Sequence, residues 1–389
     1  MKDIKVAIQY PSFGPQHPPR LEAIYERRPT PDSVVVAMEM FRKDSDYEWR
    51  PVRVKSNTYQ RYTVVDDESA SARKKYGKLR EEVFRALDDI SPDVLVVNGW
   101  GHRESRISLD WCRKNRCGIV ILSDSVRENR VRFWPLELYK KWLLRGIRAG
   151  FAAGTPQARY LKYLGIPPQN IFHPGSCVVD NDYWYDMATN IRGTSEIYRE
   201  KFGLPERYFL SVARFLDWKN IPFLIRSYDL YKKEEKDNAI DLVICGSGSD
   251  EDRIRAEIER LKLSSVHLHG FRQVDELPVY YGLASCFILP SCRFECWGFV
   301  VNEAMASGLP VLVSNMVGSA EDLVTEGVNG HTFDPNNEEE LAILMSKVVS
   351  DEKERMKMGK KSLRMIGGHN TEIAAENLWK AVKAALEIV

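Results

Sequence analysis

Short apolar runs alternate with longer amphipathic stretches along the first half of the chain. Residues 4–10 form an apolar run that predicts a strand. Residues 93–100 and 118–125 are continuous apolar runs ending in small polar residues, which is typical of buried parallel strands and the loops after them. Residues 72–90 predict a helix, because apolar side chains recur there at helical spacing: Tyr76, Leu79, Val83, Phe84 and Leu87.

Four further stretches of the first half also carry a pattern. A helix is predicted over 31–43, which opens with proline followed by an acidic residue, and a strand over 48–54. A long basic and aromatic helix is predicted over 135–150, with a strand over 151–155 after it.

The same alternation starts again after about residue 190. Strands are predicted over 208–214, 240–248, 265–271, 286–291 and 310–315, with helices over 220–234, 250–263 and 274–284 between them. A pattern of this kind indicates two α/β domains with parallel sheets. At 389 residues the chain has the length of two domains, which we expect over 1–190 and 191–365, followed by a C-terminal helix over 366–389.

Composition and charge exclude several classes of function. With 56 Lys and Arg against 55 Asp and Glu, the chain lacks the basic excess of a general nucleic-acid binder. No apolar run approaches 18 residues, and the first residues form a short strand rather than a signal peptide, so a cytoplasmic protein is expected. The seven scattered cysteines, without CxxC spacing, favour a reduced chain.

Candidate binding groups follow the predicted strands of the second half. Arg214 and Lys219 come after the strand over 208–214, where two cations can hold an anion with several oxygens. Gly246-Ser247-Gly248 follows the next strand and resembles the start of a dinucleotide fingerprint. Glu251 stands in place of its third glycine, so this motif alone indicates a tight turn or a close approach to the backbone.

The strongest signal is the stretch ECWGFVVNEAMASG, from Glu295 to Gly308. Gly298 precedes a predicted helix, whose first amides, those of Phe299 and Val300, are suited to a phosphate. Glu295 before the helix and Glu303 within it cannot bind phosphate, but they can accept hydrogen bonds from hydroxyl groups. Hydroxylated groups on both sides of a phosphate are the layout of a sugar nucleotide.

From Tyr208 to about Asp334 the chain resembles the nucleotide-binding domain of a family 4 retaining glycosyltransferase of the GT-B type. The matching segments, in the family's order, are SVARFLDWKN, LVICGSGSDE, VHLHGF, LPVYYGLASCFILPS, ECWGFVVNEAMASGLPVLVS and GSAEDLVTEGVNGHTFDP. The resemblance implies two Rossmann-like domains facing a central cleft, with the C-terminal helix returning to the N-terminal domain.

The resemblance also implies a role for each matching residue. Arg214 and Lys219 would hold the diphosphate, Glu303 the ribose hydroxyls and Glu295 the hydroxyls of the donor sugar. The backbone near Gly270 and Phe271 would receive the base, and the amides of Phe299 and Val300 would meet the phosphate or the sugar.

The first half departs from this family pattern. A single Gly14, followed by proline, replaces the family's paired-glycine loop after the first strand, whose amides approach the donor phosphate, so Gly14 is the donor-binding candidate there. Ser123 and Asp124 stand where the family often has a histidine directed at the donor sugar, so Asp124 and His102 are both candidates for that position. Asp180 and Asp182 occupy an altered family turn, where they are expected to form the turn.

The expected mechanism uses no cofactor and no metal, because no Asp-x-Asp pair follows a strand of the second half. Arg214, Lys219 and the helix N-terminus would then stabilise the leaving group, and the resemblance implies attack on the same face of the sugar, with retention. Three alternatives stay open: a sugar-nucleotide 2-epimerase, a nicotinamide-dependent oxidoreductase and a non-catalytic sugar-binding module.

The expected partners are a nucleotide sugar, with UDP, GDP and ADP equally compatible, and a carbohydrate or glycolipid acceptor. Residues 12–31 and 56–72 are the expected acceptor loops. The helix over 135–150 combines cations with aromatics, which suits weak contact with an anionic membrane. The alternative is that its tryptophans cover the sheet and its cations form a solvated face.

Overall fold

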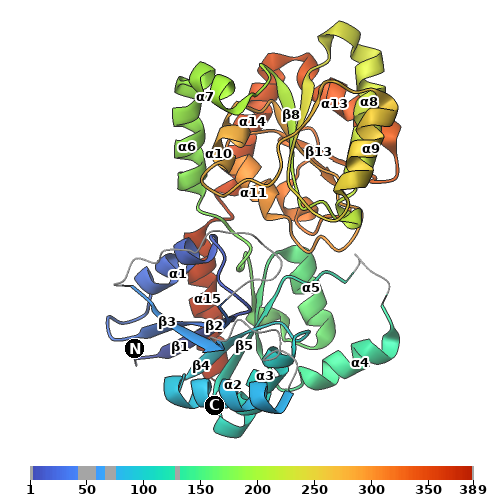
Figure 1. Cartoon of the computed structure of the whole chain (residues 1–389). Helices are drawn as coiled ribbons and strands as arrows, with labels where there is room; N and C mark the ends of the chain where they lie inside the picture. The colour runs from blue at the N-terminus through green and yellow to red at the C-terminus, as the bar shows by residue number, and fades with distance from the viewer. Residues whose placement is uncertain (1–2, 43–57, 66–75, 128–131, 388–389) are drawn as a thin grey trace. The chain divides into compact units, whose positions relative to one another are not determined.

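The chain folds into two compact units, each an α/β domain built on one parallel sheet. The computed structural model describes residues 3–42, 58–65, 76–127 and 132–387 (Figure 1). Unit 1 contains the described residues up to Val179 together with Asn370 onward, and unit 2 is Asp180–His369. Within the described ranges no helix is both long and apolar enough to cross a membrane.

Unit 1 is a seven-stranded sheet in the order β3-β2-β1-β4-β5-β6-β7, and the pairings are parallel. Its strands are β1 Lys5–Tyr10, β2 Val34–Phe41, β3 Gln60–Val65, β4 Val94–Asn98, β5 Gly118–Ser123, β6 Ala149–Ala152 and β7 Ile171–Phe172. Its helices are α1 His17–Glu26, α2 Tyr76–Ile90, α3 Arg103–Asn115, α4 Trp134–Leu143, α5 Thr155–Leu164 and α15 Thr371–Leu386.

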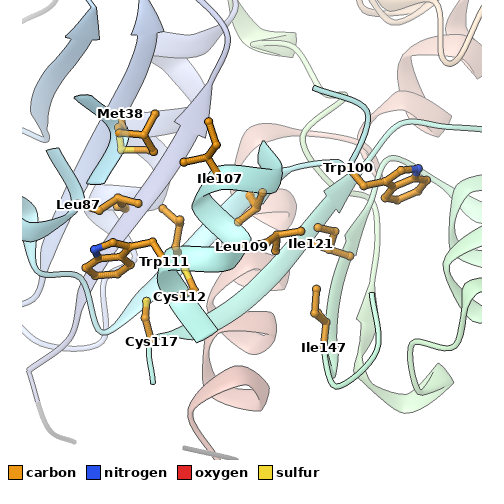
Figure 2. Close-up of a cluster of buried hydrophobic side chains, with 14 of the residues drawn as sticks. Met38, Leu87, Trp100, Ile107, Leu109, Trp111, Cys112, Cys117, Ile121 and Ile147 are labelled. Atoms are coloured by element: carbon orange, nitrogen blue, oxygen red, sulfur yellow. The ribbon is translucent and has the colours of Figure 1, made fainter. Parts of the chain in front are cut away.

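The sheet of unit 1 is buried on both faces. One apolar cluster joins the sheet to α2, α3 and α5, and Figure 2 shows Leu87, Trp111 and Ile121 within it. A second cluster joins the sheet to α1 and α15, where Leu378 and Val382 of α15 are buried. The C-terminal helix therefore returns to the first unit, as the family resemblance implied.

Residues 31–43, predicted as a helix, form strand β2 instead. The run VVVAMEMF is buried along most of its length and pairs with β1 and β3 on its two sides. Its valines favour a strand, but a parallel strand buried on both faces has no alternating pattern to reveal it. The proline and the acidic residue before the apolar run therefore wrongly indicated the start of a helix.

Two other sequence predictions for this region have different outcomes. The strand predicted over 48–54 lies outside the described residues. The expected acceptor loop over 12–31 contains helix α1, and the one over 56–72 contains strand β3. Helix α1 was missed because two adjacent prolines normally argue against a helix. Here they occupy its first turn, where proline costs little.

Unit 2 is a six-stranded parallel sheet in the order β10-β9-β8-β11-β12-β13. Its strands are β8 Tyr208–Val212, β9 Asp241–Cys245, β10 Val266–Leu268, β11 Cys286–Leu289, β12 Val311–Ser314 and β13 Gly330–Phe333. Its helices are α6 Asn181–Gly193, α7 Ser195–Phe202, α8 Ile221–Glu235, α9 Glu251–Leu261, α10 Leu277–Leu283, α11 Phe299–Ala306, α12 Ala320–Leu323, α13 Glu338–Ser350 and α14 Glu352–Ile366.

The boundary of unit 2 lies at the start of α6. Asp180 caps this helix by accepting a hydrogen bond from the Tyr183 amide at 3.0 Å, which is the turn-forming role expected of it. Arg192 Nε, near the end of α6, donates to the Gly282 carbonyl at 3.0 Å and ties the helix to α10. Residues 180–190, which the sequence assigned to the first domain, therefore pack with the second unit.

Candidate active site

The predicted donor-binding residues of unit 2 follow the carboxyl ends of neighbouring parallel strands. Arg214 and Lys219 follow β8, Gly246 follows β9, Gly270 and Phe271 follow β10, and Glu295 and Gly298 follow β11. These strands are adjacent in the order β10-β9-β8-β11, so their loops share one edge of the sheet. Ligands of open parallel sheets bind at this edge.

Lys219 and Glu295, expected to contact different parts of a donor, contact each other. The Lys219 ammonium donates a hydrogen bond to Glu295 Oε2. Ser291, which is fully buried, donates its hydroxyl to the same oxygen at 3.0 Å. The two charged side chains are only 14% and 13% exposed, so this is a sheltered ion pair rather than a solvated surface pair.

The loop carrying Glu295 is held from both sides. The indole of Trp297 donates to Asn302 Oδ1 at 2.8 Å, and both side chains are buried, which fixes the loop onto α11. The Gly318 and Ser319 amides donate to the Glu295 and Trp297 carbonyls at 3.0 and 3.2 Å. These bonds fix the backbone of the loop, whereas Lys219 and Ser291 hold the Glu295 carboxylate itself.

Gly298 permits the sharp entry into α11. Its φ of +91° lies in the left-handed region. A Cβ at this position would lie 3.0 Å from Leu289 Cδ2 and 3.2 Å from Val317 Cγ1. Phe299 and Val300 then form the first turn of the helix, where the helix dipole favours an anion.

The loop after β8 positions Lys219 by backbone geometry. A 3₁₀ turn covers Asp217–Lys219 and ends at Asn220, which has a φ of +59°. Asn220 Nδ2 donates to the Pro335 carbonyl at 3.0 Å, and Arg293 forms an ion pair with Asp217. Arg214, at the start of this loop, is half-buried.

Glu303 faces a different environment from Glu295. Its partner is Tyr281, a fully buried residue of α10, whose hydroxyl donates to Glu303 Oε2 at 2.8 Å. Burial raises the pKa of Glu303 to about 7, even though the hydrogen bond from Tyr281 lowers it. Glu303 is therefore a carboxyl group that changes charge near neutral pH.

Packing against the loop after β8 requires glycine at positions 246 and 248. A Cβ on Gly246 would lie 1.8 Å from the Ala213 carbonyl oxygen, and one on Gly248 would lie 2.5 Å from that of Phe215. The Phe215 amide also donates to the Ser247 carbonyl at 2.7 Å. The close approach indicated by the sequence is thus made by the loop after β8, and contact with a donor stays a prediction for Gly246.

The backbone near Gly270 also joins neighbouring loops. The Gly270 carbonyl accepts a hydrogen bond from the Gly246 amide at 2.8 Å, and Gly270 has a φ of +68°. Phe271 beside it is half-buried. The proposed base-binding backbone therefore adjoins the loop of Gly246.

In unit 1 the predicted residues follow three adjacent strands, β1, β4 and β5. Gly14, after β1, donates its amide to His17 Nδ1 at 2.7 Å. His102, after β4, has a side chain that is 61% exposed, and its Nδ1 lies 3.7 Å from Glu104 Oε1. Asp124, after β5, is exposed. Topology places all three positions at the same edge of the sheet.

Several functional neighbours were not predicted from the sequence. Tyr281 and Ser291 hold the two glutamates, yet an aromatic in an apolar helix and a serine after a strand look like ordinary core and loop residues. His17 was also missed. The ring centroid of His17 lies 4.5 Å from that of Tyr10. Burial, together with the nearby Arg20 charge, holds the pKa of His17 well below its usual value. The contact of Tyr281 with Glu303 joins two helices, and the burial of Ser291 and His17 depends on packing, so neither feature is visible in the local sequence.

The part of the chain that matches a protein family lies within unit 2. Residues 194–365 match the family of glycosyl transferases group 1. The group 1 segment contains every donor-binding residue predicted in the second half, from Arg214 to Glu303.

Curated relatives of this chain include glycosyltransferases. The serotype-specific mannosyltransferase WbdA of Escherichia coli is 30% identical over 284 residues, which cover 69% of this chain and 34% of the relative. The poly(glycerol-phosphate) alpha-glucosyltransferase of Bacillus subtilis is 27% identical over 178 residues, covering 46% of this chain and 26% of the relative. The matched part thus spans well under half of either relative.

Solved structures extend the likeness to the whole chain. Sucrose-phosphate synthase from Thermosynechococcus elongatus superposes with a TM-score of 0.74 at 17% identity, covering 99% of this chain and 100% of that one. The Anabaena protein Alr3699/HepE, solved in complex with UDP and glucose, gives 0.72 at 16% identity, covering 98% and 100%. The predicted GT-B fold class, with two Rossmann-like α/β domains, is confirmed.

Proposed function

We propose that this protein is a retaining glycosyltransferase of family 4. It transfers a hexose from a nucleotide-diphosphate sugar to a saccharide, lipid-linked or small-molecule acceptor in the cytoplasm. The observation that carries the proposal is the joining of Lys219, Glu295 and the start of α11 at the carboxyl edge of the unit 2 sheet. A cation, a carboxylate and a helix N-terminus in one place suit a donor with phosphate and hydroxyl groups.

Each group has a part in the proposed reaction. Arg214, Lys219 and the amides of Phe299 and Val300 stabilise the diphosphate as it leaves. Glu295 accepts hydrogen bonds from the donor sugar, and Glu303 accepts them from the ribose. The departing phosphate takes the proton of the acceptor, which attacks on the same face, so the bond formed keeps the configuration of the bond broken. Asp124 and His102 remain candidates for contacts to the donor sugar.

The relatives support a hexose donor. They include a mannosyltransferase and a glucosyltransferase, and the Anabaena structure contains UDP. We therefore include UDP, GDP and ADP sugars as candidate donors. The seven cysteines, scattered without CxxC spacing, support work in a reducing compartment.

The decisive experiment follows the fate of the donor. A thermal-shift panel of nucleoside diphosphates and their sugars selects the donor, since a ligand at 100 times its dissociation constant stabilises a protein by about 2.7 kcal/mol. Product analysis with that donor then separates the candidates. Transfer to an acceptor, with the anomeric configuration kept by NMR and activity persisting in excess EDTA, is the expected result. An epimer formed from donor alone, an inverted product, or metal-reversible loss of activity would each contradict the proposal.

A further inference from the structure

Helix α4 turns two of its charged side chains, Glu137 and Lys140, toward the interior of unit 1. Glu137 and Lys140 are 3% and 8% exposed, and Lys140 Nζ donates to Glu137 Oε1 at 2.6 Å. Tyr160 of α5, which is 1% exposed, donates its hydroxyl to Glu137 Oε2 at 2.8 Å. The inward stripe continues at Leu143, six residues after Glu137. The buried face of α4 thus begins with a neutralised charge cluster rather than an apolar surface.

The aromatic side chains of α4 face solvent. Trp134, Leu138 and Trp142, at positions i, i+4 and i+8 of one helical face, are 70%, 55% and 66% exposed. Tyr139 stacks on Trp142 with ring centroids 5.9 Å apart. We call the α4 patch the exposed apolar side chains of this segment: Phe133, Trp134, Leu136, Leu138, Tyr139 and Trp142. The tryptophans therefore do not cover the sheet, which was the alternative considered from the sequence.

The surroundings of the α4 patch are basic. Residues 132–170 contain seven Lys and Arg and one acidic residue, Glu137, whose charge is compensated inside the fold. Four of the cations are exposed side chains next to α4 or on its neighbour α5: Arg145, Arg148, Arg159 and Lys162. Figure 1 shows α4 at the periphery of unit 1, beside α5.

We propose that the α4 patch docks on an anionic membrane surface. Tryptophan and tyrosine favour the boundary between lipid and water, and exposed Lys and Arg beside them attract acidic headgroups. A contact between two copies of the chain is less favourable, because a two-fold interface would bring the same basic region of each copy together. The proposal concerns α4 of unit 1 and uses none of the residues to which the proposed reaction assigns a role.

Sedimentation with vesicles tests the docking. The full chain is expected to pellet with vesicles of phosphatidylcholine and phosphatidylglycerol at low ionic strength. It should pellet much less with phosphatidylcholine alone, or at about 1 M salt, where the Debye length falls to about 3 Å. Protein that stays in the supernatant with the anionic vesicles at low salt overturns the proposal.

Matched variants separate the patch from general stickiness. The double variant Trp134→Ser/Trp142→Ser should lower binding more than about tenfold, since each tryptophan would otherwise bury a large apolar surface. Ile343→Ser on α13 removes a residue that is also 66% exposed and should leave binding unchanged. Circular dichroism checks that each variant is folded. Equal loss in both variants, or unchanged binding of the tryptophan variant, overturns the proposal.

A charge-reversal pair and a measurement without lipid complete the test. Arg145→Glu/Arg148→Glu should abolish the preference for anionic vesicles, whereas Arg253→Glu on α9, another exposed arginine, should not. Analytical ultracentrifugation without vesicles should show the same oligomeric state for the wild type and the tryptophan variant. A wild-type dimer that becomes monomeric in this variant would overturn membrane docking and identify the patch as a contact between copies.

Discussion

The ammonium of Lys219 donates a hydrogen bond to the carboxylate of Glu295, although the two residues are 76 positions apart in the sequence. The sequence suggested two independent donor-binding groups, one for phosphate and one for sugar. Their contact means that each one restrains the other before any donor arrives. A bound diphosphate would then find Lys219 already placed, and Glu295 would keep a fixed orientation toward the sugar.

A double-mutant cycle should detect this coupling in the free energy of unfolding. Lys219→Met and Glu295→Gln should each destabilise the protein by about 1–3 kcal/mol, because each leaves a sheltered charge without its partner. The double variant should lose less than the sum, with a coupling of about 0.5–3 kcal/mol in urea unfolding. The exposed pair Arg255–Glu251, at 2.7 Å, is the control, where about 0.3–0.5 kcal/mol is expected. Equal coupling in both cycles would contradict a sheltered pair.

The two cations should be required for turnover. Arg214→Ala and Lys219→Ala should each reduce kcat by about 100–1,000-fold, because a preorganised group stabilising the leaving diphosphate is lost. Steady-state kinetics with the donor selected by thermal shift gives the measurement. Arg253→Ala, which removes an exposed cation of α9, is the matched control and should keep wild-type activity. Wild-type kcat in either site variant would show that the phosphate lies elsewhere.

The two glutamates should separate binding from turnover. Glu303→Ala should weaken binding of the free nucleoside diphosphate, since the lost carboxyl would contact the ribose. Glu295→Ala should largely spare that binding, because Arg214, Lys219 and the start of α11 still face the diphosphate, and should reduce turnover instead, because a contact to the donor sugar is lost. Isothermal titration with the diphosphate and kinetics with its sugar measure the two effects. Equal loss of diphosphate affinity in both variants would mean that the assigned layout is wrong.

The sequence predicted the parts of this molecule that depend on local pattern. Two parallel-sheet domains followed from the alternation of apolar runs and helices, and the segment from Glu295 to Gly308 indicated a loop and helix start at a strand end. Strand β2 was mispredicted because a doubly buried strand lacks a periodic signal.

Pairings between distant segments carried no signal along the chain. The sequence could not show that Glu295 lies against Lys219, or that Tyr281 holds Glu303. Helix α4 shows the same limit. Its aromatics and cations were evident, but only packing against Tyr160 decides that Glu137 and Lys140 face inward and the tryptophans outward.

The raised pKa of Glu303 has a consequence for stability. Its usual pKa is 4.5 and burial raises it to about 7 in the folded chain. Between these values the folded state holds a proton that the unfolded chain has released. This carboxyl therefore makes folding less favourable as the pH rises from 4.5 to 7. Glu303→Gln removes the titration and should flatten that part of the stability profile.

Donor binding should depend on pH in the opposite direction. If the ionised Glu303 binds the ribose hydroxyls, the competent fraction rises from about a tenth at pH 6 to about nine-tenths at pH 8, and affinity rises up to about tenfold. The intact nucleotide sugar is the right ligand, because its diphosphate diester does not titrate near pH 7. Isothermal titration across this range should give a midpoint near 7 for the wild type. Glu303→Gln should show no such dependence. Tyr281→Phe should move the midpoint higher, since it removes the hydrogen bond that lowers the Glu303 pKa. A midpoint that stays in place in Tyr281→Phe, or a dependence that survives in Glu303→Gln, would show that another group titrates.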